Sequence, residues 1–91
     1  MTLTPAQVTE QGGKFIYFLK RYITGAETQQ IGEWTIPKTI GMEAGPAYEM
    51  PDGREIIIHW RHDYSTGQFT EGHVTEYPSP QASAAEGWEI D

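Results

Sequence analysis

Apolar side chains in the N-terminal quarter of the chain recur at spacings of three, four and seven residues. Thr4 and Pro5 provide an N-cap hydroxyl followed by a proline suited to the first helical turn. The recurring apolar positions are Val8, Phe15, Phe18, Leu19, Tyr22 and Ile23. This spacing predicts one N-terminal helix over about residues 5–24.

Two glycines interrupt this helical pattern and leave alternatives open. Gly12 and Gly13 each disfavour a helix interior by up to ~1 kcal/mol. A short turn followed by a helix from about residue 14 is therefore the second prediction. A strand over Lys14–Thr24 is the third, because apolar residues there would occupy both faces of a strand.

The second half of the chain alternates between apolar and polar residues around two turn signals. Pro51-Asp52-Gly53 is typical of a type I turn with a glycine bulge, and the second turn spans residues 64–67. The run from Ile56 to Asp63 is then a strand, and Phe69–Tyr77 is its return strand. A shorter strand is expected over residues 32–36, ended by Pro37.

Placing both turns in register puts apolar residues on one face of the predicted sheet. Tyr48 lies opposite Ile56, Ile58 opposite Val74, and Trp60 opposite Gly72. The predicted helix would cover this face. The sequence therefore predicts an α+β fold, with one N-terminal helix packed on a three- to four-stranded antiparallel β-meander. We expect one domain over residues 1–78 and a flexible acidic C-terminal tail over residues 79–91.

The opposite face of the same sheet gathers the candidate catalytic side chains. The register places His59 opposite His73 and Arg61 opposite Glu71, with Cβ atoms roughly 4.5–5.5 Å apart across the strands. Two such histidines could serve as acid and base at a phosphodiester, with Arg61 holding the phosphate charge. A solvated His pair beside an ordinary ion pair is the simpler interpretation, and no catalytic set is favoured.

No cofactor or metal is predicted. His59 and His62 point to opposite faces of a strand, so this spacing cannot chelate as it would on a helix. The sequence contains no phosphate-binding loop, dinucleotide fingerprint, nucleophile elbow or cysteine.

The net charge restricts the possible functions of the chain more than its overall composition does. The 91 residues include 6 Lys and Arg against 13 Asp and Glu, which gives a net charge of −7. All six charged residues after Arg61 are acidic. This balance disfavours direct nucleic-acid binding, and no apolar run approaches the ~18 residues of a membrane span. Without a secretory signal pattern or any cysteine, the chain is expected to be cytoplasmic.

These observations favour a small acidic protein-binding module that is not an enzyme. We expect a stoichiometric inhibitor of a basic, nucleic-acid-handling partner, for example an immunity protein or a phage anti-defence protein that mimics nucleic acid. The candidate partner-binding residues are Glu49, Glu55, Glu71, Glu86, Trp88 and Glu89. The alternatives are a small metal-independent ribonuclease that uses His59 and His73, and an accessory subunit of a larger assembly. The sequence does not define the oligomeric state.

Overall fold

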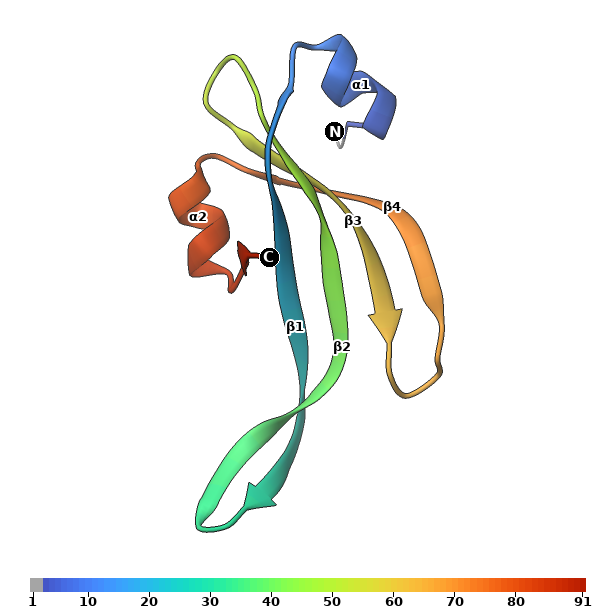
Figure 1. Cartoon of the computed structure of the whole chain (residues 1–91), viewed down its shortest axis with the longest axis vertical. Coiled ribbons are helices and arrows are strands. Elements are labelled where there is room, and N and C mark those ends of the chain that lie inside the picture. Colours follow the sequence, from blue (N-terminus) through green and yellow to red (C-terminus); the bar gives the residue numbers. More distant parts are fainter. Residues whose placement is uncertain (1–2) are drawn as a thin grey trace.

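A five-stranded antiparallel sheet with two short helices forms the structure, a computed structural model that describes residues 3–91 (Figure 1). The strand order is β4-β3-β2-β1-β5. The elements are α1 (Pro5–Glu10), β1 (Lys14–Ile31), β2 (Trp34–Glu49), β3 (Glu55–Asp63), β4 (Phe69–Tyr77), α2 (Pro80–Ala85) and β5 (Glu89–Ile90). No helix in the described part of the chain is long and apolar enough to cross a membrane.

The predicted fold class is wrong, because most of the expected N-terminal helix is a strand. Thr4 caps α1 as expected, but the helix ends at Glu10, before the two glycines. The next eighteen residues form β1. A strand suits this segment because its apolar side chains point to both faces of the sheet. Leu19 is buried on one face, while Phe18 lies on the other. The apolar residues of this strand resemble a helical pattern because a register shift between Phe15 and Tyr17 interrupts the strict alternation of a strand.

The two faces of the sheet carry separate apolar clusters. On what we call the α1 face, the buried residues Val8, Met50 and Ile56 pack with Tyr48, Ile58 and Val74. On what we call the α2 face, the buried cluster consists of Leu19, Ala47, Ile57 and Trp88. The side chains of the adjacent residues Ile56 and Ile57 thus point to opposite faces of the sheet, as strand geometry requires.

The C-terminal segment is not the expected flexible tail. Ser79 caps α2 by accepting a hydrogen bond from the Ala82 amide, with Pro80 in the first turn. β5 then pairs with β1 through Leu19↔Ile90 and Lys20↔Glu89. Because of this segment, the face that we expected to be open is largely covered.

The predicted strand pairing is confirmed at most of the predicted positions in the two hairpins. Tyr48 lies opposite Ile56, Ile58 opposite Val74 and His59 opposite His73. Beyond His59 a bulge shifts the register, so that Arg61 lies opposite Thr70 and the expected Arg61–Glu71 pair is wrong. Trp60 lies within the bulge, where the regular pairing is interrupted. Gly72 has φ +80°, a conformation that glycine adopts without strain, and this allows the bulge.

β1 and β2 extend well beyond the other strands, as Figure 1 shows. β3 pairs with β2 only as far as Gly41↔Asp63, so the two strands pair only with each other over residues 24–39. We call this part the hairpin arm. It includes the short strand expected over residues 32–36, but Pro37 lies within β2 rather than ending a strand. Proline is tolerated there because no third strand needs its missing N–H. The radius of gyration is 15.0 Å, against about 12 Å for a compact domain of this length.

Candidate functional site

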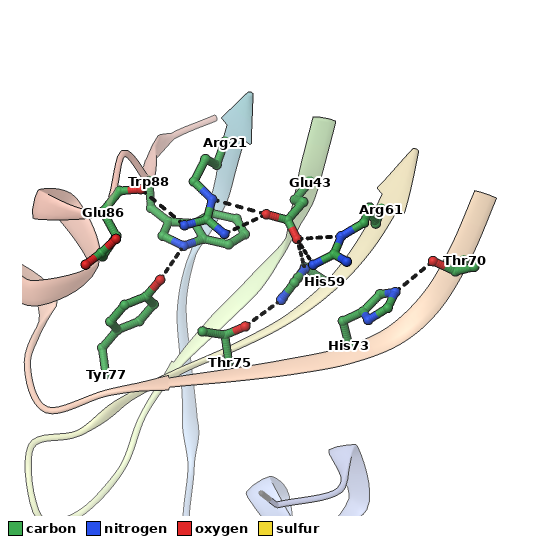
Figure 2. A network of polar contacts seen from close by, with 10 residues as sticks. All are labelled: Arg21, Glu43, His59, Arg61, Thr70, His73, Thr75, Tyr77, Glu86 and Trp88. Atoms are coloured by element: carbon green, nitrogen blue, oxygen red, sulfur yellow. Dashed lines mark hydrogen bonds and ion pairs between the residues drawn. The ribbon is translucent and has the colours of Figure 1, made fainter. Parts of the chain in front are cut away.

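A row of three charged side chains crosses the α2 face. Arg21, Glu43 and Arg61 are direct cross-strand neighbours on β1, β2 and β3 (Figure 2). Arg21 donates to Glu43 Oε2 from Nε and Nη2 at 3.1 and 2.7 Å. Arg61 donates to Glu43 Oε1 from Nε and Nη2 at 2.9 and 2.7 Å. Each carboxylate oxygen therefore receives two charge-assisted hydrogen bonds.

Glu43 remains ionised although its side chain is only 1% exposed. Burial raises the pKa of this carboxyl group, but the hydrogen bonds and charges of Arg21 and Arg61 outweigh burial, so the pKa is lowered overall. The row has one carboxylate and two guanidinium groups, and Arg61 is half-exposed. It is therefore a largely satisfied ionic network that fixes three strands.

His59 lies beside this row and is almost fully buried. Its Nε2 hydrogen bonds with Thr75 Oγ1 at 2.8 Å, whereas Nδ1 lies 3.5 Å from Glu43 Oε1 and makes no hydrogen bond. Burial lowers the pKa of His59 to about 4, and the charge of Glu43 opposes this effect only in part. The imidazole is therefore neutral at physiological pH.

Trp88 covers His59 and attaches the C-terminal segment to the sheet. The two rings meet edge to face, with centroids 5.1 Å apart, and Trp88 Nε1 donates to the Tyr77 hydroxyl at 2.9 Å. Arg21 Nη1 donates to the Glu86 carbonyl oxygen at 3.2 Å. Trp88 is 4% exposed, so this side chain is part of the core in the structure.

The candidate catalytic residues are only partly brought together. The His59 and His73 rings stack with centroids 5.6 Å apart, and His73 Nε2 hydrogen bonds with Thr70 Oγ1 at 2.7 Å. Arg61 is engaged by Glu43, and Glu71 is exposed on the bulged part of β4. Acid–base chemistry at the pair stays a prediction that the burial of His59 under Trp88 does not favour.

A cavity of about 510 Å³ opens beside the charged row, but it does not reach the histidines. Its walls include both arginines of the row together with Tyr22, Ile40, Asp63 and Glu86. Asp63 and Glu86 place negative charge on these walls, which disfavours a phosphate ligand.

The candidate partner-binding acids fall into two groups. Glu49, Glu71, Glu86 and Glu89 are exposed. Glu55 is fully buried on the α2 face, where the Tyr17 hydroxyl donates to its Oε2 at 2.7 Å. Burial, followed by the contact with Glu55, raises the pKa of Tyr17 to about 12. In the structure, Glu55 and Trp88 are part of the core. The four exposed acids remain accessible to a partner.

Sequence reasoning missed two features that the structure makes prominent. Glu43 belongs to none of the elements predicted from the sequence, so its position between two arginines had no sequence signal beyond its charge. Trp34 lies at the tip of the hairpin arm and is 75% exposed. The Gly32-Glu33 pair between Ile31 and Trp34 was the available signal for this second feature, since glycine in a two-residue loop favours a hairpin.

Among residues 3–91, no group of three or more metal-ligating side chains is arranged to hold an ion. No protein-family model matches the chain, and comparison with curated proteins and with solved structures finds no match either.

Proposed function

We propose that this protein is a binding module that occupies a basic surface of a partner protein and so acts as a stoichiometric inhibitor. A nucleic-acid-handling protein carries a surface of this kind. The hairpin arm is the observation that supports this proposal best. It projects beyond the sheet and ends in exposed apolar side chains, which the fold itself does not use.

The arm is poorly explained as a contribution to stability. Every residue from 26 to 38 is exposed, and the two strands have no third strand or helix packed on them. An isolated two-stranded hairpin is marginally stable in water at best. The arm therefore costs stability unless a partner covers it, which supports a role in contact.

The tip of the arm has the chemistry of a protein-binding anchor. Ile31 and Trp34 pair directly on either side of the turn and are 57% and 75% exposed. Tryptophan is among the residues that dominate binding energy at protein interfaces. Glu27 and Glu33 outnumber Lys38 on the same arm and, with the net charge of −7, would attract a basic partner.

Affinity capture with matched variants tests this proposal. The full chain is immobilised and exposed to host-cell lysate at low and at high salt, beside Trp34→Ala and the control Tyr64→Ala. Tyr64 is a 47% exposed aromatic residue outside the arm. We expect one stoichiometric partner that is retained by the wild type and by Tyr64→Ala, lost by Trp34→Ala, and weakened by salt. Equal capture by Trp34→Ala, or no partner at either salt, would overturn the proposal.

A further inference from the structure

The α1 face carries a second exposed apolar surface, separate from the hairpin arm. α1 packs only on the end of this face near Met50 and Ile56 (Figure 1). We call the remainder the aromatic face; its main side chains are Phe15, Phe18, Tyr22, Trp60 and Phe69. Phe15 and Phe18 contact each other with ring centroids 5.0 Å apart, and Trp60 and Phe69 do so at 5.3 Å. Four of the five are about half-exposed, and Trp60 is partly buried.

One row of side chains across the strands shows how charge is arranged on the aromatic face. Lys20 of β1 and Trp60 of β3 lie in this row on either side of β2. Glu89 of β5 pairs with Lys20 and so lies at one end of the row. At the other end, alternation along β4 from Phe69, which contacts Trp60, places Glu71 on the same face. The two outermost strands therefore put a carboxylate on either side of an apolar centre.

These edge carboxylates make the aromatic face acidic. The Nζ atom of Lys20 lies 3.8 Å from Asp91 Oδ1, so that acid balances the positive charge of the face. Glu71 and Glu89 are exposed, and none of the ion pairs within residues 3–91 involves either of them. A second copy of the chain would bring the same two acids and a net charge of −7 against them, which opposes self-association through this face. The complementary occupant is apolar at its centre and basic at its flanks.

An amphipathic helix fits the spacing of these features. β4 and β5 are separated by four strand spacings, or about 19 Å. A helix with its side chains is about 10–12 Å across, which leaves about 4 Å on each side for Lys or Arg side chains to reach the edge carboxylates. The face already accepts a helix at its other end, where Val8 of α1 is buried in a cluster with Met50 and Ile56. A second helix would continue the cover that α1 begins.

We propose that the aromatic face is the docking surface for an amphipathic helix of a partner protein, whose apolar stripe is flanked by lysine and arginine residues. The aromatic side chains cover the stripe, and Glu71 and Glu89 pair with basic residues on its two flanks. No residue of the hairpin arm belongs to this face, so the contact does not need the arm. The proposal goes beyond the function proposed for the arm, and the two can fail separately.

Binding of model peptides to the full chain tests this inference. The probe is a labelled helical peptide of about five turns with a leucine stripe flanked by lysines, and fluorescence anisotropy measures its affinity. One control peptide has glutamate in place of lysine, and a second has the same composition scrambled so that no stripe forms. The leucine–lysine peptide should bind with a dissociation constant below about 100 μM, and each control at least about tenfold more weakly.

Matched charge variants locate the contact on the face. Glu71→Gln combined with Glu89→Gln removes both edge charges, so it should weaken peptide binding roughly tenfold and flatten its dependence on salt. Glu27→Gln combined with Glu33→Gln changes the net charge of the chain equally but on the arm. This second double variant should keep the affinity within about twofold of wild type, because its charges lie away from the peptide.

A change at the apolar centre completes the set. Phe18→Ser should weaken peptide binding roughly 30-fold or more, whereas Trp34→Ser, a matched change at the tip of the arm, should not. Circular dichroism identifies the folded variants. If Phe18→Ser does not fold, Phe69→Ser alters the same face from β4, where the side chain is 52% exposed.

Three outcomes would rule out this docking surface. The first is no binding of the leucine–lysine peptide by the wild type, or equal binding of a control peptide. The second is binding that the folded variants of the face retain. The third is a wild-type dimer in sedimentation equilibrium that Phe18→Ser dissociates, because a second copy would then be the occupant. Failure of the arm proposal is a separate result, since it appears in lysate capture with Trp34→Ala and not in peptide binding.

Discussion

Arg21 lies over the indole ring of Trp88, with its Cζ atom 4.7 Å from the ring centroid. The same guanidinium reaches both the Glu43 carboxylate and the Glu86 carbonyl oxygen. One side chain of β1 thus links the charged row to the C-terminal segment. A cation–π contact of this kind contributes about 0.5–2 kcal/mol, and it adds to the burial of the indole.

Replacing Trp88 with alanine should destabilise the whole fold and not merely release the C-terminal segment. The indole is buried between His59, Tyr77 and Arg21, so its removal should cost about 3–5 kcal/mol of unfolding free energy. Urea denaturation followed by circular dichroism at one fixed protein concentration measures this change. Trp34→Ala is the matched control, because its exposed indole should contribute little. Equal midpoints for the two variants would contradict the role assigned to Trp88.

Replacing Glu43 with glutamine should also destabilise the protein strongly. The amide removes the negative charge that two arginines share, and its NH₂ group would face a guanidinium donor. Breaking a buried ion pair in this way costs about 3–5 kcal/mol. Glu71→Gln, at an exposed position, should change the free energy of unfolding by less than about 0.5 kcal/mol. Similar urea midpoints for the two variants would show that the row is not an essential support.

The sequence was informative where two local signals agreed. Pro51-Asp52-Gly53 and the alternating residues after it identified the β2–β3 and β3–β4 hairpins, including the pairing of His59 with His73. Turn chemistry and strand period gave the same register there, which is why that pairing was predictable. The bulge at Gly72 was not predictable in the same way, because a single glycine fits both a regular strand and a bulge.

The N-terminal half was misread because periodicity alone cannot separate a buried strand from a helix. Phe15 to Ile23 have apolar residues on both faces, since Leu19 meets Trp88 while Phe18 lies on the aromatic face. The covering of the α2 face depends on contacts between residues distant in the sequence, such as Arg21 with Glu86. Such contacts leave no local pattern.

Replacing Gly45 with alanine should disturb the contact between β2 and β3. A Cβ atom at this position would lie 2.7 Å from His59 Cα and still closer to the Ile58 carbonyl oxygen. Backbone atoms of a central strand cannot move aside easily, so the loss should be at least about 1–3 kcal/mol. Gly25→Ala is the comparison, because a Cβ there meets only the Ile40 side chain, at 3.2 Å at the closest. Thermal unfolding should separate the two variants; equal transition temperatures would mean that the strands have room for a side chain.

Acidification should weaken the fold in a pH range set by His59. Burial first, with the nearby charges of His73, Arg61 and Arg21, lowers the pKa of this imidazole from 6.5 to about 4. The unfolded chain therefore binds a proton between these values that the folded chain does not, and stability falls as the pH decreases from about 6.5 to 4. The full shift corresponds to a loss of about 3 kcal/mol. The contribution of Glu43 is lost at still lower pH, because its pKa is lowered from 4.5.

A variant that cannot titrate isolates this effect. His59→Gln keeps a hydrogen-bonding group near Thr75 but gains no proton, so its unfolding free energy should vary much less between pH 6.5 and 4. His62→Gln, on the opposite face of the sheet, should retain the wild-type dependence on pH. Urea unfolding at intervals of half a pH unit measures all three proteins. If His59→Gln loses as much stability on acidification as the wild type, the burial of a neutral His59 is not the cause of the loss.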